Sequence, residues 1–247
     1  MNIRHFDSRT TASAYIASEM HTLIETRPQS VLGLATGDTM LDVYQALRQL
    51  LSASKVDLST VKRFNLDEYV GLSENDPQSY YAYMNKHLFL PSLSWNHNNI
   101  HLPNGRAHDL VAEASQYEQA LDDAGPVDIQ LLGIGMNEHI GFNEPGTPFD
   151  SVTRVVDLSD TTLRSNRKHF ESYEAMPKQA ISMGIQSIMR AKRIMLVTFG
   201  RNKADIVSKL LTGRVTEDLP ASILHQHPNV EIVVDDALYD VIAESLE

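Results

Sequence analysis

The fold of this chain is decided by the stretch Gly133-Ile-Gly-Met-Asn-Glu-His-Ile-Gly-Phe-Asn-Glu-Pro-Gly146, which directly follows a short apolar run. That run, residues 127–132, predicts a buried strand because turn-forming residues bound it on either side. His139 and Glu144 then fall in a glycine-rich turn just beyond the carboxyl end of the strand. Ligands bind at this edge in open α/β sheets, so we expect a catalytic loop here.

Outward from this loop, short apolar runs alternate with longer amphipathic stretches, which is typical of strand–helix units in a mostly parallel sheet. The expected strands are Ser30–Ala35, Val61–Asn65, Val127–Gly133, Arg193–Phe199 and Val230–Val234. The expected helices are Thr11–Glu25, Thr39–Ser54, Pro77–Leu88, Asp109–Asp123, Pro177–Arg190 and Lys203–Thr212. We therefore predict a single α/β domain over residues 1–247.

Residues 147–176 depart from this alternation, because they are polar, rich in Ser, Thr and Arg, and only weakly periodic. A stretch of this kind after a catalytic loop is expected to be either a mobile lid or a plain surface excursion.

The composition excludes several classes of function. The chain has 247 residues, a formal net charge of -11 and no cysteine. The charge disfavours nucleic acid and anionic membranes as main partners, and the lack of cysteine excludes thiolate chemistry and Cys-ligated metals. No apolar segment approaches the roughly 18 residues of a membrane span, and the N-terminus has no apolar signal core, so we expect a cytoplasmic protein.

A glycine-containing turn, Thr36-Gly37-Asp38-Thr39, joins an expected strand to an expected helix. Free N–H groups and the positive end of a helix dipole at such a turn suit a phosphate. The alternative is an ordinary N-capped helix, since the pattern is neither a Walker loop nor a dinucleotide fingerprint.

Two adjacent carboxylates, Asp67 and Glu68, follow the expected strand Val61–Asn65. Neighbouring residues on an extended backbone point to opposite faces, so only one of them is expected to enter a cleft. There it could act as a general base. The alternative is a solvated turn or helix cap.

Asn137, His139 and Glu144 could form a proton-transfer relay, in which the amide or the carboxylate orients the imidazole. Histidine suits this role because its pKa lies near neutrality. Zinc is a poorer interpretation, since the spacing differs from His-Glu-x-x-His. Basic residues that could hold an anionic substrate, or be plain solvated side chains, are Arg164, Arg167, Lys168, Arg201 and Lys203.

Taken together, these segments resemble the glucosamine-6-phosphate deaminase family, within the wider group that includes the 6-phosphogluconolactonases. The resemblance extends over nearly the whole chain. Its marks are Ala35-Thr-Gly37, Asn65-Leu-Asp-Glu-Tyr-Val-Gly-Leu72, Gln78-Ser-Tyr-Tyr81, Gly133-Ile-Gly135, His139-Ile-Gly-Phe-Asn-Glu-Pro-Gly146, Pro177–Gly184, Gly200 with Lys203-Ala204, Pro220–Leu224 and His227-Pro228.

This resemblance implies a modified Rossmann-like, three-layer α/β fold and the conversion of glucosamine 6-phosphate and water into fructose 6-phosphate and ammonia. It implies no metal and no organic cofactor. The partner would be a small phosphosugar, and the protein would be a monomer or a homo-oligomer.

The resemblance also implies roles for individual residues. Asp67 would move a proton from C2 to C1 of the open-chain sugar. His139 would assist ring opening, with Asn137 and Glu144 orienting it. The phosphate would be held by the turn 36–39 and Lys203.

Three positions depart from the family pattern. Asp38 puts a carboxylate into the phosphate turn, Glu138 replaces a small residue before the histidine, and Lys168 aligns with a phosphate-binding arginine. If the backbone at position 138 requires a positive φ, a residue other than glycine is strained there. Two other functions therefore stay open: a related isomerase or deaminase of galactosamine 6-phosphate, and a non-catalytic sugar-phosphate sensor.

Overall fold

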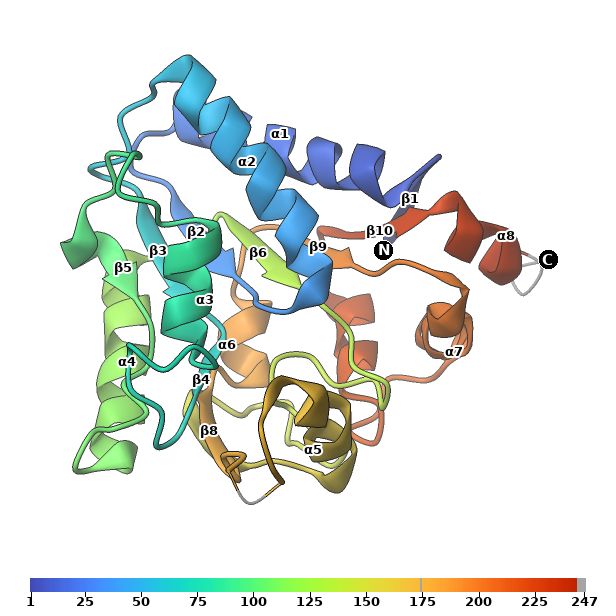
Figure 1. Cartoon of the computed structure of the whole chain (residues 1–247). Helices are drawn as coiled ribbons and strands as arrows, with labels where there is room; N and C mark the ends of the chain where they lie inside the picture. The colour runs from blue at the N-terminus through green and yellow to red at the C-terminus, as the bar shows by residue number, and fades with distance from the viewer. Residues whose placement is uncertain (174, 244–247) are drawn as a thin grey trace.

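A parallel seven-stranded sheet forms the centre of the molecule (Figure 1). The computed structural model describes residues 1–173 and 175–243. In spatial order the strands are β1 (Asn2–Phe6), β10 (Val230–Asp235), β9 (Ile194–Val197), β6 (Ile129–Leu132), β2 (Val31–Leu34), β3 (Lys62–Asn65) and β5 (Ile100–His101). The inner strands β2, β6 and β9 are buried at every position, as expected for a parallel sheet covered on both faces.

Helices flank this sheet. They are α1 (Arg9–Thr26), α2 (Leu41–Ser54), α3 (Tyr80–His87), α4 (Leu110–Ala124), α6 (Ile185–Met189), α7 (Ala204–Thr212) and α8 (Asp236–Ala243). A further helix, α5 (Asp160–Asn166), packs instead in a smaller cluster apart from the main core. Neighbouring side chains of β3 show the layers: Phe64 packs edge-on against Tyr117 of α4, whereas Arg63 stacks on Trp95, which follows α3. The segments around α3 and α4 therefore cover opposite faces, which gives the expected three layers.

A second, smaller sheet lies beyond the carboxyl end of β3. Its antiparallel strands are, in order, β4 (Asp67–Tyr69), β8 (Gln179–Ser182) and β7 (Arg154–Asp157). Asp67 is opposite Ser182 in this sheet. The sheet thus holds the backbone of Asp67 in place immediately after the main strand ends.

The predicted helix Pro177–Arg190 is wrong. Residues Gln179–Ser182 form β8, because β4 and β7, both distant in sequence, supply its hydrogen-bond partners on either side. Gly184 then lies so close to Ser151 that an added Cβ would be 2.2 Å from the Ser151 carbonyl oxygen. The chain bends there, and only the short α6 follows.

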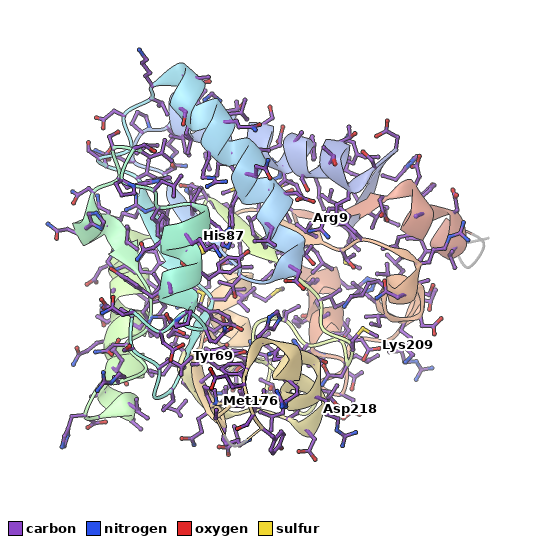
Figure 2. The ribbon with its side chains drawn as sticks, viewed as in Figure 1. Arg9, Tyr69, His87, Met176, Lys209 and Asp218 are labelled. Carbon is purple, nitrogen blue, oxygen red and sulfur yellow. The ribbon has the colours of Figure 1, made fainter. Side chains whose placement is uncertain are left out.

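The polar segment 147–176 contains β7, α5 and a short 3₁₀ helix, Arg167–His169. Three of its apolar residues, Leu158, Leu163 and Met176, pack with Tyr69 and other residues in a small cluster apart from the main core; Tyr69 and Met176 are labelled in Figure 2. This segment is therefore docked on the second sheet. Of the helices that the structure describes, none is long and apolar enough to cross a membrane.

Candidate active site

A cavity of about 210 Å³ opens at the carboxyl ends of β2, β3 and β6. It brings together three of the segments singled out in the sequence, namely the turn 36–39, Asp67 and His139. The lining residues are Ala35, Thr36, Gly37, Thr39, Leu66, Asp67, Tyr80, Gly133, Ile134, Gly135, His139, Gly141, Phe142 and Asn166. This is the edge of the sheet where a ligand is expected.

Asp67 lies on one side of this cavity with 6% of its surface exposed. Burial, followed by the nearby charge of Glu68, raises the pKa of Asp67 to about 8. The chain passes close to it at Gly141, where φ is +57° and an added Cβ would lie 3.7 Å from Oδ2. A carboxylate in this environment is suited to take up and return a proton near neutral pH.

Glu68 points away from this cavity, as the alternation along a strand requires. Its carboxylate accepts hydrogen bonds from the backbone N–H groups of Tyr69, Tyr80 and Tyr81. Both interpretations of the Asp-Glu pair therefore apply, one to each residue: Asp67 enters the cleft, and Glu68 caps the start of α3.

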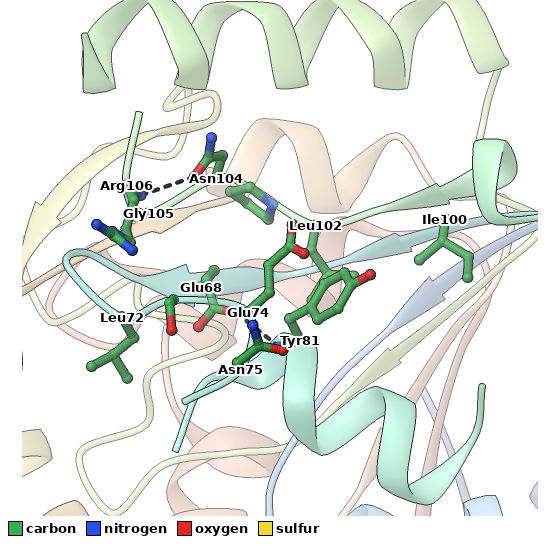
Figure 3. A pocket seen from close by; sticks show the side chains of 12 residues that line it. Glu68, Leu72, Glu74, Asn75, Tyr81, Ile100, Leu102, Asn104, Gly105 and Arg106 are labelled. Atoms are coloured by element: carbon green, nitrogen blue, oxygen red, sulfur yellow. Dashed lines mark hydrogen bonds between the residues drawn. The ribbon is translucent and has the colours of Figure 1, made fainter. Parts of the chain in front are cut away.

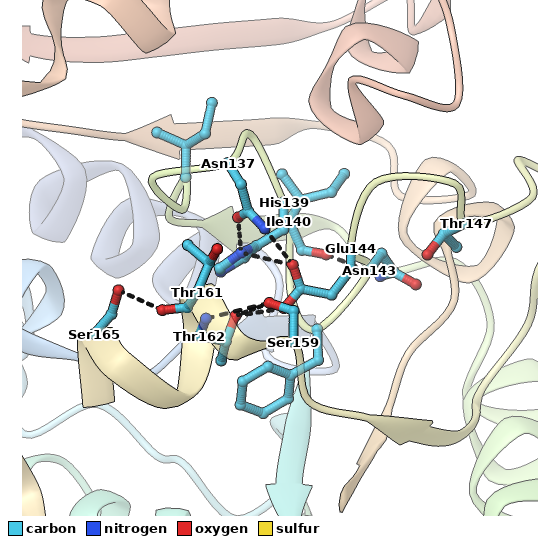
Figure 4. Close-up of polar contacts among 12 residues, drawn as sticks. Asn137, His139, Ile140, Asn143, Glu144, Thr147, Ser159, Thr161, Thr162 and Ser165 are labelled. Carbon is cyan, nitrogen blue, oxygen red and sulfur yellow. Dashed lines mark hydrogen bonds and ion pairs between the residues drawn. The ribbon is translucent and has the colours of Figure 1, made fainter. Parts of the chain in front are cut away.

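His139, Asn137 and Glu144 form a connected chain of hydrogen bonds (Figure 4). His139 Nδ1 lies 2.6 Å from Asn137 Oδ1, and Asn137 Nδ2 donates to Glu144 Oε2 at 2.5 Å. Since an amide oxygen only accepts, the network assigns the hydrogen to Nδ1. Nε2 of His139 is then left to exchange a proton with a ligand.

Glu144 is held as an anion at the end of this relay. Burial opposes its charge, but the hydrogen bond and charge of His139, followed by the hydrogen bonds from Thr162 and Asn137, lower the pKa of Glu144 to about 2. The Thr162 hydroxyl comes from α5, so the segment 147–176 contributes directly to the relay. Gly135 is required beside it, because an added Cβ would lie 2.2 Å from the imidazole ring.

The predicted phosphate turn borders the same cavity. Gly37 has a φ of +104°, and its carbonyl accepts a hydrogen bond from the Tyr83 hydroxyl at 2.8 Å. Asp38 is exposed and borders an adjoining cavity, also of about 210 Å³, together with Tyr83 and His87. Asp38 is not among the residues that line the Asp67 cavity, whereas Thr36, Gly37 and Thr39 are.

Of the two predicted phosphate-binding lysines, Lys203 contacts Ile134, one of the residues that line the cavity. Its half-buried ammonium donates to the carbonyl of Ile134 at 2.8 Å, and burial lowers its pKa. The backbone of Lys168 lies in the 3₁₀ helix Arg167–His169, whereas its side chain is outside the part of the chain that the structure describes.

Glu138 has the positive φ, +61°, at which a side chain is strained. It is buried, and its Oε1 lies 3.4 Å from Lys209 Nζ. The residue is not among those that line the Asp67 cavity.

Sequence reasoning did not single out three residues of the site, Tyr80, Thr162 and Asn166. Asn166 lines the cavity and donates to the Tyr69 hydroxyl at 3.0 Å. Tyr80 belongs to the motif Gln78–Tyr81 and forms part of the cavity wall. Among the described residues, no group of three or more His, Cys, Asp and Glu is arranged to hold a metal ion.

The chain belongs to the glucosamine-6-phosphate isomerase/6-phosphogluconolactonase family, whose sequence pattern matches residues 7–233. It is 55% identical over 240 residues to the glucosamine-6-phosphate deaminase of Staphylococcus haemolyticus strain JCSC1435, covering 97% of this chain and 99% of that protein. The enzyme of the same name from Staphylococcus aureus strain MRSA252 is 49% identical over 236 residues, covering 96% and 94%.

Solved structures give the same assignment. A structure described as a monomeric glucosamine-6-phosphate deaminase is 42% identical, has a TM-score of 0.94, and matches 98% of this chain and 100% of that one. The 6-phosphogluconolactonase from Leishmania guyanensis, at 22% identity and a TM-score of 0.76 over 96% of this chain and 97% of that one, shares the fold.

Proposed function

We propose that this protein is a glucosamine-6-phosphate deaminase, converting glucosamine 6-phosphate and water into fructose 6-phosphate and ammonia. The observation that carries the proposal is the placement of two proton-transfer groups on one cavity: Asp67, with its pKa raised to about 8, and His139, the end of the Asn137–Glu144 relay. Relatives at 49–55% identity bear this name.

His139 opens the sugar ring in the first step. Nε2 is free to pass a proton between the anomeric hydroxyl and the ring oxygen, which yields the open-chain aldehyde. Asn137 keeps the imidazole in the required tautomer, and ionised Glu144 stabilises the imidazolium that forms in between.

Asp67 carries out the second step by removing the proton from C2 and returning it to C1. The intermediate is an enol-type amine, in which the C1 oxygen has taken up the proton that the substrate ammonium gives up. Protonation at C1 by Asp67 then converts it into an iminium at C2. Addition of water to the iminium and loss of ammonia give the ketone. One carboxylate can serve both carbons because they are neighbours, and Tyr80 and Phe142 help to wall the space in which this happens.

The phosphate is assigned to the turn Thr36-Gly37-Asp38-Thr39 together with Lys203 and Lys168. Thr36, Gly37 and Thr39 line the cavity, and the Lys203 ammonium donates to the carbonyl of Ile134, which also lines it. The positive charge of Lys203, together with the one assigned to Lys168, would compensate the phosphate dianion. The position of Asp38 on the adjoining cavity supports this assignment, because it reduces the repulsion that its carboxylate would otherwise exert.

The segment 147–176 is assigned as a lid. It supplies Thr162 to Glu144 and Asn166 to the cavity wall, so its position controls whether the relay is complete. A single copy of the chain provides all of the residues named above, which supports catalysis by a monomer, as described for the 42% identical relative.

Release of ammonium and fructose 6-phosphate from purified protein tests the proposal. Glucosamine 6-phosphate is the substrate, galactosamine 6-phosphate is the parallel substrate, and Asp67→Asn is the negative control. Equal molar amounts of both products from the glucosamine compound alone are expected. Turnover of the galactosamine compound in its place would assign the other epimer, and detectable binding without turnover of either would favour a sugar-phosphate sensor.

A further inference from the structure

A larger cavity, of about 580 Å³, lies beside β4 (Figure 3), and Asp67 is not among the residues that line it. Glu68 lines it, together with Tyr81 of α3 and the loop from Leu102 to Arg106. Only 4% of the Glu68 surface is exposed, although its neighbour Asp67 performs the chemistry on the opposite face. Glu68 does not line the catalytic cavity, so its burial calls for an explanation.

Glu68 connects β4, the strand that carries Asp67, to α3, the helix that carries Tyr80 of the cavity wall. One oxygen accepts from Tyr69 N at 2.8 Å and from Tyr80 N at 2.9 Å, and the other accepts from Tyr81 N at 2.8 Å. These donors belong to two separate elements, β4 and the first turn of α3. Because Tyr80 lines the catalytic cavity, the same carboxylate fixes the distance between Asp67 and that wall.

We propose that Glu68 is a positioning residue of the active site, which fixes Asp67 against the Tyr80 wall and places a second negative charge directly behind the base. This inference rests on the proposed function, in which Asp67 moves the proton. The charge of Glu68 acts in the required direction, since after burial it is the next cause that raises the pKa of Asp67. A base whose proton affinity is too low would be ionised but weak.

The tyrosines near Asp67 do not change charge in the pH range in which Asp67 titrates. Tyr69 on its own strand, Tyr80 from α3 and Tyr117 from α4 all have pKa values raised above 10 by burial, so they stay neutral. His139 faces Asp67 across the cavity and is common to all variants described below.

The groups around Glu68 itself provide a control. Glu74 and Arg106 line the same cavity but are exposed, and Asp76 adds a further negative charge that acts on Glu68. Glu74 makes none of the three bonds to β4 and α3. Glu74→Gln therefore removes a charge from the cavity without releasing α3.

The test compares pH profiles of kcat/KM for wild type, Glu68→Gln, Glu68→Asp and Glu74→Gln. Removing the charge in Glu68→Gln should move the acidic limb to lower pH by roughly one unit, with kcat reduced about tenfold because Asp67 is displaced. Glu68→Asp keeps the charge but shortens the side chain that connects β4 to α3. We therefore expect kcat to fall while the acidic limb of the pH profile stays at the same pH. Glu74→Gln should match wild type. Thermal unfolding confirms that each variant is folded.

A second readout does not depend on turnover. Carbon-13 NMR of labelled aspartates identifies the Asp67 carboxyl as the signal missing in Asp67→Asn, and its titration midpoint should fall in Glu68→Gln. If wild type released no ammonium, the proposed function would fail while this titration still tested the role of Glu68. A midpoint and a kcat/KM profile in Glu68→Gln that coincide with wild type would overturn the proposal.

Discussion

Asp67 and Glu144 are carboxylates of the same active site, yet their surroundings act on them in opposite directions. Asp67 sits on a regular strand where burial and a like charge raise its pKa to about 8. Glu144 sits in a glycine-rich loop where His139, Thr162 and Asn137 overcome the effect of burial and lower its pKa to about 2.

This difference separates the two roles. A carboxylate with a pKa near neutrality can exchange a proton during the reaction, whereas one that stays ionised throughout can only orient and compensate charge. Asp67 is thereby suited to act as the base and Glu144 as the partner of His139. Substitutions at the two carboxylates should therefore have different effects.

The largest effect is expected for Asp67→Asn. The amide cannot accept the C2 proton, so kcat should fall by about 10⁴-fold, while glucosamine 6-phosphate should bind within a few-fold of wild type. Ammonium release measures the first and isothermal titration calorimetry the second. Asp67→Glu, which retains a displaced carboxylate, should keep some residual turnover. Wild-type turnover in Asp67→Asn would show that another group is the base.

A smaller loss is expected for Glu144→Gln. The amide keeps the size of the side chain but removes the charge opposite His139. In one of its two orientations its NH₂ group would face Asn137 Nδ2, which is also a donor, so this hydrogen bond would be lost. We expect kcat to fall about 10²-fold. Thr162→Val removes a single hydrogen bond to the same carboxylate and should give an intermediate rate. If Glu144→Gln were as inactive as Asp67→Asn, the two carboxylates would not have the separate roles inferred from their pKa values.

Stability should respond to pH with opposite signs at the two carboxylates. The pKa of Asp67 is raised from 3.8 to about 8, so its contribution to stability is full below pH 3.8 and is lost as the pH rises towards 8. Asp67→Asn should therefore be more stable than wild type at pH 8, by at least about 1 kcal/mol, and the gain should vanish near pH 4.

For Glu144 the pKa is lowered from 4.5 to about 2, so its contribution is present above pH 4.5 and is lost as the pH falls through 2. Glu144→Gln should be less stable than wild type at pH 7 by about 1 kcal/mol, a value reduced for partial exposure. Urea unfolding of both variants at several pH values measures these differences. Equal signs for the two variants would contradict the opposed environments.

The sequence was sufficient to predict what depends on local pattern. The strands β2, β6, β9 and β10 are predicted because each is a short, largely apolar run between turn residues. β3 lies where it is predicted, although Phe64 is its only apolar residue. The same pattern placed Asp67 and His139 at one edge of the sheet, where the structure finds both on a single cavity.

What the sequence did not predict depends on contacts between distant segments. β1 (Asn2–Phe6) is a polar edge strand whose pairing with β10 has no local signal, and β8 needs β4 and β7 to become a strand. Asn166 reaches Tyr69 across 97 residues of sequence, and Thr162 reaches Glu144 only because α5 docks on the second sheet. Such residues become visible once the tertiary packing is known.

The smallest effect is expected from backbone strain, which differs between the strand of Asp67 and the loop of His139. Asp67 lies in a paired strand, whereas the relay loop contains Glu138 at a φ of +61°. Glu138→Gly should relieve about 1 kcal/mol of strain and lose only a weak contact to the exposed Lys209, giving a net gain of about 0.5 kcal/mol in the free energy of unfolding. Glu138→Ala loses the same contact but keeps the strain, so it should show no gain, and urea unfolding distinguishes the two. If Glu138→Gly also lost turnover, the bulk of Glu138 would be needed to hold His139, and the strained loop would then be a requirement of the relay that the regular strand of Asp67 does not share.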